Sequence, residues 1–255
     1  MTANQISTLV PKMKPSMPPE LLADLRRFNT PTLCNAVETF AVRLRNEGYT
    51  LPTLRAQIVP RSTMVGHAVT MRIRSVGPAL DGHRYLEDTR WWDAVLAVPE
   101  PRVVVIQDLD AGASAGSFIG QVHAAILRAM GVVGVMTDGA VRDVESIGRL
   151  GLAVYSGTVS VSHAYAHVVD VGRAVEVAGL KVESGDWLHG DVHGVISIPP
   201  EIGGALPAVA GRLMSREQEL IDACSAPGDV LERLRVLLRA EAPPPARGPG
   251  LTRPD

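Results

Sequence analysis

Three short runs rich in valine and isoleucine alternate with two helix-like segments in the middle of the chain, and this pattern constrains the fold most. The runs are PRVVVIQDLD at 101–110, VVGVMT at 132–137 and LAVYSG at 152–157. Continuous β-branched runs indicate strands buried on both faces. Residues 121–131 and 140–151 between them have the periodicity of helices. This alternation over 103–156 predicts parallel strands joined by right-handed crossovers.

Further elements are predicted on both sides of this unit. Residues 64–76 alternate apolar and polar side chains, as a half-buried strand does. Residues 175–200 read as strands joined by Gly-Asp turns. Two polar-faced helices follow at 211–225 and 229–241.

Two helices have recognisable boundaries in the sequence. The first begins with Thr30 as its N-cap and Pro31 in its first turn, and ends near Gly48. The second ends at Gly131, and its buried face is predicted to carry one apolar stripe: Val122, Ile126 and Met130.

The chain is long enough for one large domain with a substantial core. We expect a mixed α/β domain over 19–240, with a sheet core from about 65 to 198. An N-terminal extension covers 1–18. The tail at 241–255 is rich in proline and glycine and is predicted to be disordered.

Charge and hydropathy narrow the classes of function. With 46% hydrophobic and 20% charged residues, the chain reads as a soluble globular protein, and its net charge of −2 favours neither nucleic acid nor a membrane surface. We expect neither a secretory signal nor a membrane span, because prolines interrupt the first twenty residues and no apolar stretch approaches the length of a bilayer span. Cys34 and Cys224 lie far apart without metal-type spacing, which favours a reducing, cytoplasmic setting.

The stretch GVMTDGAVRD at 134–143 is the first candidate site. It ends a buried run and places Asp138, Arg142 and Asp143 within six positions. Ligands of α/β sheets collect beyond the C-terminal ends of parallel strands, next to helix N-termini. There Arg142 can grip a carboxylate and Asp143 can bind Mg²⁺. The alternative is an aspartate that favours the helix start, beside a solvated arginine.

Three other stretches carry weaker signals. The glycine-rich segment 112–123 can supply backbone amides to an anion or can be a simple connector. His189, Asp191 and His193 alternate, as metal ligands or as polar residues on an exposed strand face. The tryptophans of RWWDA at 90–94 line a pocket or pack in the core.

Several motifs resemble the RraA-like family, which includes the 4-hydroxy-4-methyl-2-oxoglutarate/4-carboxy-4-hydroxy-2-oxoadipate aldolases. Gly120–Gln121, then twenty residues, then Arg142–Asp143 and Glu145 resemble that family's Gly-Asp and Arg-Asp signature. The stretches TPTLCNAVE, MGVVGVMTDGAVRD and VEVAGLKVESGDWLHGDVHGVISIPP are also similar to the family. The resemblance covers roughly 28–225.

The resemblance implies an α/β fold of the RraA/HMG aldolase type, a swivelling α/β/α sandwich with helices at both termini. It implies a homotrimer or a dimer of trimers (a homohexamer) with active sites between subunits. Such enzymes are class II aldolases that use Mg²⁺ or Mn²⁺, and they often decarboxylate oxaloacetate. The substrate would be a small-molecule 2-keto acid.

The resemblance also implies roles for individual residues. Arg142 would bind the carboxylate and keto oxygen of a pyruvate-like group, and Asp143 would anchor the metal. Gln121 stands where the aldolases have an aspartate. A neutral amide can orient a water but cannot act as a base, which indicates a divergent subgroup. The segments 77–89 and 90–93 also look unlike the simplest aldolases.

Backbone and partner-subunit groups complete the implied site. The amides of Val122 and His123, which follow Gly120, would meet the substrate carboxylate. Either Glu217 or Glu219, on the C-terminal helix of a neighbouring subunit, would contribute a carboxylate.

The expected function is therefore a metal-dependent lyase that performs retro-aldol cleavage or β-decarboxylation of a 2-keto acid. Both reactions leave a pyruvate-like enolate, whose charge a divalent cation and Arg142 would stabilise. Two alternatives stay open: a non-catalytic RraA-like regulator that binds a protein, and a metal-dependent isomerase or hydratase that uses the same pocket.

Overall fold

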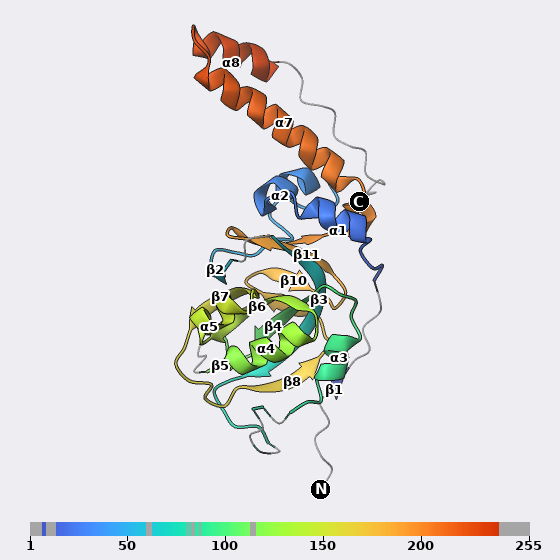
Figure 1. The fold of residues 1–255 in the computed structure, drawn as a ribbon, viewed down its shortest axis with the longest axis vertical. Coiled ribbons are helices and arrows are strands. Elements are labelled where there is room, and N and C mark those ends of the chain that lie inside the picture. The colour runs from blue at the N-terminus through green and yellow to red at the C-terminus, as the bar shows by residue number, and fades with distance from the viewer. Residues whose placement is uncertain are drawn as a thin grey trace, which may run out of the picture.

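A computed structural model of the chain describes residues 7–8, 14–59, 63–80, 82, 85–86, 88–112 and 116–239. The tail predicted at 241–255 lies outside these residues. In the described part of the chain, ten strands form one mixed sheet (Figure 1). Its main path runs through β1 (Ser7–Thr8), β8 (His167–Val171), β3 (Met64–Arg74), β4 (Arg102–Asp108), β6 (Val132–Val141), β7 (Ala153–Val159) and β2 (Arg55–Ile58).

Three more strands join this sheet off the main path. β5 (Ser117–Ile119) pairs with β6, β11 (Trp187–Asp191) pairs with β3, and β12 (Gly194–Ile198) pairs with β11. β1 belongs to the predicted N-terminal extension and pairs in parallel with β8.

The parallel unit predicted from the valine-rich runs is confirmed. β4 pairs in parallel with β6, and β6 pairs in parallel with β7. The connections between them contain α4 (Gln121–Ala129) and α5 (Val144–Arg149). Both helices therefore begin near the edge of the sheet where the parallel strands end.

Different elements cover the two faces of the sheet. α3 (Trp92–Leu96), α4 and α5 cover one face, where buried side chains from each of them pack on the strands: Val95, Leu127 and Ile147. The hairpin of β9 (Val175–Val177) and β10 (Leu180–Val182) packs on Met136 and Tyr155 of the other face. The strands between these layers are thus buried on both sides.

The terminal helices form a separate apolar core on β11 and β12. They are α1 (Pro19–Leu25), α2 (Thr30–Glu38), α6 (Pro200–Gly203) and α7 (Leu206–Ser225). α8 (Val230–Arg239) packs on the end of α7 that lies farthest from the sheet (Figure 1). The mixed α/β fold with helices at both ends is confirmed. No helix of the described residues is both long and apolar enough to cross a membrane.

Local predictions for α2 need correction. The N-cap is Asn29, whose side chain accepts a hydrogen bond from the Thr32 amide at 2.8 Å. The helix ends at Glu38 rather than near Gly48. Ala41 has a φ of 51°, a left-handed conformation that a helix cannot continue through.

Burial differs from the prediction in β3 and α4. The first eight residues of β3 are all buried because the strand is central and covered on both faces, so it is not half-exposed. The buried face of α4 carries His123, Ala124 and Leu127, whereas Val122 is 54% exposed. The helix is rotated so that the His123 ring stacks on Phe118. Gly131, with a φ of 72°, follows the helix as predicted.

Candidate functional site

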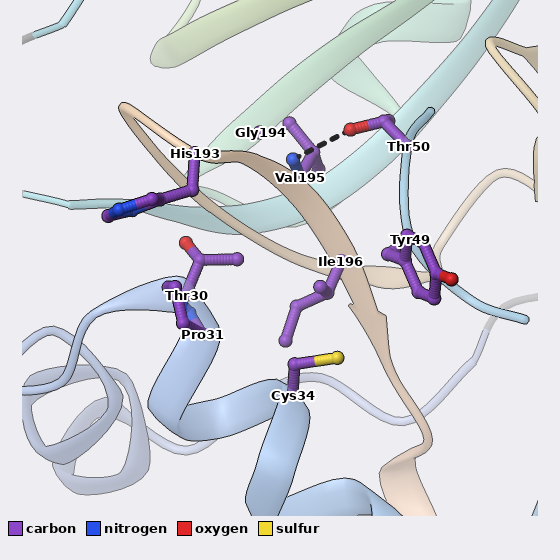
Figure 2. Close-up of a pocket in the computed structure, with 9 residues that line it drawn as sticks. All are labelled: Thr30, Pro31, Cys34, Tyr49, Thr50, His193, Gly194, Val195 and Ile196. Carbon is purple, nitrogen blue, oxygen red and sulfur yellow. Dashed lines mark hydrogen bonds between the residues drawn. The ribbon is translucent and has the colours of Figure 1, made fainter. Parts of the chain in front are cut away.

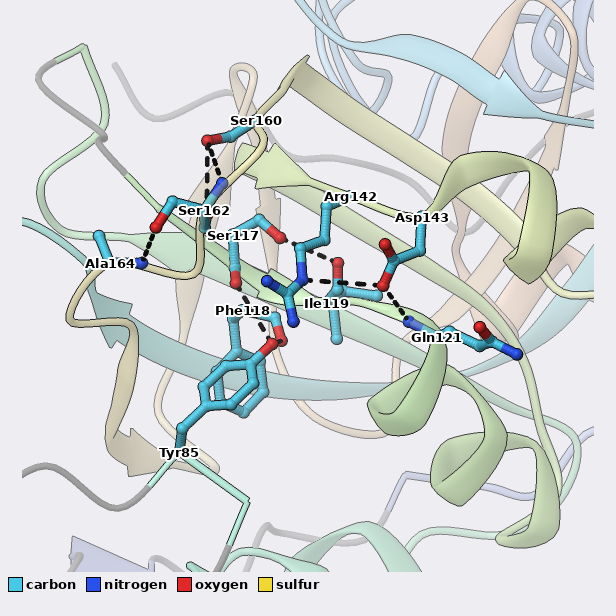
Figure 3. A network of polar contacts seen from close by, with 10 residues as sticks. All are labelled: Tyr85, Ser117, Phe118, Ile119, Gln121, Arg142, Asp143, Ser160, Ser162 and Ala164. Carbon is cyan, nitrogen blue, oxygen red and sulfur yellow. Dashed lines mark hydrogen bonds and ion pairs between the residues drawn. The ribbon is translucent and has the colours of Figure 1, made fainter.

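Asp143 connects the end of β6 to the start of α5 in an unusual backbone conformation. Its φ of 57° lies in the left-handed region, which aspartate adopts more readily than most residues. This conformation turns the carboxylate towards the start of α4, where Oδ2 accepts a hydrogen bond from the Gln121 amide at 3.0 Å (Figure 3). A carboxylate at a helix N-terminus is favoured by the free amides there.

Gly120 lies directly against this pair. A Cβ atom at this position would come within 2.8 Å of Asp143 Oδ2 and 2.9 Å of Arg142 Nε. Real Cβ contacts are essentially never so short, so the close approach needs glycine. The structure therefore brings together Gly120, Gln121, Arg142 and Asp143, which the sequence separates by twenty residues.

The backbone of Arg142 is held by a hydrogen bond to the neighbouring strand, whereas its side chain is held less firmly. Its amide donates to the Ile119 carbonyl at 3.0 Å. Its Nε is buried, has no hydrogen-bond partner among the described residues, and lies 3.7 Å from Asp143 Oδ2. A buried donor without a partner is costly, so a ligand that supplies an acceptor would stabilise it. The side chains of Arg142 and Asp143 are 29% and 42% exposed, which leaves both accessible.

Tyr85 contributes a ring beside Arg142 that the sequence did not predict. The Arg142 Cζ lies 5.9 Å from the centroid of this ring. The Tyr85 hydroxyl donates to the Phe118 carbonyl at 2.9 Å (Figure 3). Burial raises the pKa of Tyr85, so its hydroxyl stays protonated near neutral pH. The one signal in the sequence was that segment 77–89 differs from the simplest aldolases.

His123 and Val122 occupy the first turn of α4, where backbone amides lack intrahelical acceptors. The His123 side chain is buried and stacks on Phe118, with 4.5 Å between ring centroids. Burial lowers the pKa of His123, so the ring is neutral near neutral pH. The neutral ring adds no positive charge next to Arg142. The backbone amide of His123 is a separate feature and belongs to the first turn of α4.

A divalent cation fits this site only as a largely hydrated ion. Among the described residues, no group of three or more His, Cys, Asp or Glu side chains is arranged to hold a metal. The Gln121 side chain points away from Arg142 in Figure 3. Mg²⁺ keeps several waters and often binds proteins through one or two carboxylates. Asp143, at 42% exposure, can supply one such oxygen ligand.

Asp138 lies on β6 and does not join the Arg142–Asp143 pair. Its Oδ1 accepts a hydrogen bond from the Asp108 amide at 2.7 Å, which ties β6 to β4. Burial raises its pKa to about 6. Asp138 also lines a separate open cavity of about 1020 Å³ beside Arg55.

Among the described residues, His189, Asp191 and His193 are not arranged to hold a metal, and only His193 is exposed. His189 and Asp191 are buried. Asp191 Oδ2 accepts from the Thr30 amide at 2.8 Å, and Oδ1 accepts from the His193 amide at 2.8 Å. Thr30 Oγ1 lies 3.0 Å from His189 Nδ1. This cluster ties the start of α2 to the β11–β12 hairpin.

A small cavity of about 180 Å³ adjoins this cluster (Figure 2). Its walls include Cys34, Tyr49 and Ile196, and the Thr50 hydroxyl there bonds the Val195 amide at 3.0 Å. Cys34 and Cys224 are both free. The walls of this cavity are mostly apolar.

The remaining candidates are accounted for by packing. Trp91 is buried against Phe118, with 6.0 Å between ring centroids, which supports the core interpretation of RWWDA. Residues 113–115 of the glycine-rich segment lie outside the described residues. A Cβ on Gly116 would approach the His163 carbonyl to 2.3 Å, so this glycine permits a close contact between loops.

Glu217 and Glu219 lie on α7, which with α8 projects beyond α1 and α2, away from α4 and α5 (Figure 1). Glu219 pairs with Arg216 at 2.8 Å. Among the described residues, no ion pair joins either glutamate to Arg142.

The sequence profile of the RraA-like family (Aldolase/RraA) matches residues 30–197. Among solved structures, an uncharacterized protein from Pseudomonas syringae pv. tomato str. DC3000 is similar, with 18% identity, a TM-score of 0.68, and 89% of this chain and 98% of that chain covered. Streptomyces coelicolor RraAS2, an unusual member of the RNase ES inhibitor RraA protein family, shares 20% identity with a TM-score of 0.63 over 80% of this chain and 97% of its own. These structural similarities indicate the fold alone. A comparison with curated proteins gives no significant match.

Proposed function

Because this chain belongs to the RraA-like family, we propose that it is a divalent-metal-dependent lyase that acts on a 2-keto acid. The observation that supports this most is the buried Nε of Arg142, which lies beside the Asp143 carboxylate without a hydrogen-bond partner among the described residues. A guanidinium with donors left over, next to an accessible carboxylate, suits an anionic ligand that also contacts a metal ion.

The substrate carboxylate would bind at the start of α4. The Arg142 guanidinium offers donors in a planar fork that matches a carboxylate. The amides of Val122 and His123 lie in the first turn of the helix, where they can donate hydrogen bonds to the same carboxylate. Gly120 keeps the space between helix and guanidinium free of side-chain atoms.

Asp143, together with waters, would hold Mg²⁺ or Mn²⁺. When bound, the cation supplies Lewis-acid stabilisation of negative charge that develops on the keto oxygen. Asp143 Oδ2 also accepts a hydrogen bond from the Gln121 amide. This bond orients the carboxylate before a cation binds.

The Arg142 charge would lower the barrier to breaking the bond β to the ketone. Both retro-aldol cleavage and β-decarboxylation develop enolate charge next to the carboxylate that Arg142 holds. Because the His123 ring is neutral, it would not compete with Arg142 for the negative charge of the enolate. Partial burial of Arg142 strengthens this electrostatic effect relative to bulk water.

We further propose that the functional unit is a homotrimer or a dimer of trimers. In such an assembly, a neighbouring subunit's α7 would bring Glu217 or Glu219 to the site. Sedimentation of the purified protein tests the assembly. Charge-neutral glutamine variants at each position test which glutamate contributes, because only the contributing one should lower activity.

The lyase activity is tested by incubating the protein with Mg²⁺ or Mn²⁺ and a panel of 4-hydroxy-2-keto acids and oxaloacetate. Pyruvate release, followed with a coupled dehydrogenase, is the expected result. If no member of the panel yields pyruvate under either metal, the lyase proposal is wrong. Conversion of a substrate without pyruvate release would instead indicate an isomerase or hydratase.

One observation favours a second candidate, a protein-binding regulator. Gln121 replaces the acidic residue of the aldolase motif, and its side chain points away from Arg142. A protein that only binds a partner does not need an acidic residue at position 121 to assist a metal ion. Absence of calorimetric metal binding, together with a stable protein partner in pull-down, would favour this candidate over the lyase.

A further inference from the structure

Tyr85 lies in the loop between β3 and α3 and places its ring against the Arg142 guanidinium. The Arg142 Cζ is 5.9 Å from the ring centroid. A guanidinium within about 6 Å of an aromatic centroid is attracted by the ring quadrupole. This contact joins two residues far apart in the sequence at the centre of the candidate site.

The Tyr85 ring is itself held from three directions. It stacks on His163 with 4.5 Å between centroids and an interplanar angle of 19°. Its contact with His123 is edge-on, with centroids 4.7 Å apart. Its hydroxyl donates to the Phe118 carbonyl at 2.9 Å. Three separate chain segments therefore fix the position of this ring.

Arg142 has few other restraints on its side chain. Its Nε makes no hydrogen bond to a described residue, and its separation from Asp143 Oδ2 is 3.7 Å. A long cationic side chain loses considerable rotamer freedom when it is fixed in one geometry. A rigid ring beneath the guanidinium reduces that loss before the ligand binds.

We propose that Tyr85 is a positioning residue that holds the Arg142 guanidinium in the orientation that binds the substrate carboxylate. This inference rests on the proposed function. Because the ring stacks on His163, the loop that carries His163 must also be in place for Arg142 to be aligned. The two loops therefore act on the substrate through Arg142 rather than by touching the reacting atoms.

Calorimetric titration of oxalate into the Mn²⁺-loaded protein tests the binding effect. Tyr85→Leu should raise the oxalate Kd by about 5- to 30-fold, because the ring is lost. Tyr85→Phe keeps the ring and its stack and should stay within about threefold of the wild type. Tyr49→Leu, which removes a tyrosine from the cavity near Thr30, is the matched control and should bind normally. Unchanged oxalate affinity in Tyr85→Leu overturns the inference.

A second measurement needs no ligand. In ¹⁵N-labelled protein, the Arg142 Nε–Hε signal, assigned by its absence in Arg142→Lys, should be shifted by the Tyr85 ring current. Tyr85→Leu, or Tyr85→Met if the leucine variant does not fold, should move the signal towards that of an unrestrained arginine. An unmoved signal overturns the inference even if oxalate binds. If the wild type binds no oxalate at all, the proposed function fails, and this signal alone decides the role of Tyr85.

Discussion

The Arg142–Asp143 pair and the Thr30–His189–Asp191 cluster are two polar groupings in one sheet, and they differ in how their polar atoms are satisfied. Asp191 is buried and accepts hydrogen bonds from the amides of Thr30 and His193. Arg142 and Asp143 are partly exposed, and the Arg142 Nε lacks a hydrogen-bond partner among the described residues. In one, the closed grouping, the Asp191 carboxylate is satisfied within the protein, although the buried His189 Nε2 has no hydrogen-bond partner among the described residues. In the other, the open grouping, formed by Arg142 and Asp143, both charged side chains are accessible and donor capacity is left for a ligand.

The two groupings also differ in the backbone conformation of their aspartates. Asp143 adopts a left-handed conformation at the junction of β6 and α5. Asp191 lies in the regular part of β11. Strained backbone persists where surrounding structure holds it, and it is common at functional sites. The backbone of Asp143 therefore supports the binding role that we propose for the Arg142–Asp143 grouping, and the regular backbone of Asp191 supports a structural role for the other.

The largest expected effect is on activity at the open grouping. Arg142→Ala should lower pyruvate release at least about 100-fold, because it removes the charge that stabilises the developing enolate. Its thermal midpoint should stay close to that of the wild type, because the side chain is not fully buried. Arg128→Ala, on the exposed side of α4, is the control and should keep full activity. An active Arg142→Ala enzyme would remove the distinction between the two groupings.

The closed grouping should show the opposite response. Asp191→Ala should lower the free energy of unfolding by about 2–4 kcal/mol, because it leaves the buried Thr30 amide unsatisfied. Urea denaturation measures this loss. Activity per folded molecule should not change, and Asp191→Asn should be milder because its amide oxygen still accepts. A loss of activity without a loss of stability would contradict the structural role.

Gly120→Ala tests whether the space beside Arg142 matters. The new Cβ would meet Asp143 Oδ2 and Arg142 Nε, so activity should fall at least about tenfold. Gly211→Ala on α7 meets open space and serves as the control. Steady-state kinetics of both variants give the comparison. Equal activity in the two would mean that the close approach at Gly120 is not needed.

The smallest effect concerns Asp138, which lies near the open grouping without joining it. Burial raises its pKa from 3.8 to about 6 in the folded protein. As the pH rises through this interval, the unfolded carboxyl ionises first, so the folded state loses stability. Asp138→Asn does not ionise, so it escapes this pH-dependent loss of stability. Its amide oxygen can still accept the hydrogen bond from the Asp108 amide. Its thermal midpoint relative to the wild type should therefore rise between about pH 4 and about pH 7. A pH-independent difference would show that Asp138 titrates normally.

The sequence predicted the parts of the molecule that depend on local pattern. Uninterrupted valine runs such as 103–105 identified the parallel strands, because burial on both faces removes polar residues. Motif resemblance placed Gly120 near Arg142 and Asp143. The helix at Thr30 was found, although its end was not, because the turn at Ala41 has no proline or glycine to mark it.

The parts that depend on distant contacts were not predictable. The Tyr85 ring lies at Arg142 because its own contacts with Phe118 and His163 hold it there. The Asp191 cluster exists because β11 pairs with β3 and is thereby brought to the start of α2. In a single sequence, neither contact leaves a spacing or a periodic pattern.

The central claim is that the Arg142–Asp143 grouping holds a 2-keto acid and a divalent cation. Its most direct test is a crystal structure of the protein soaked with Mn²⁺ and oxalate, with anomalous diffraction to locate manganese. The account predicts a manganese peak at the Asp143 carboxylate and an oxalate carboxylate on Arg142 and the amides of Val122 and His123. Manganese or oxalate bound elsewhere, with this site empty, would contradict it.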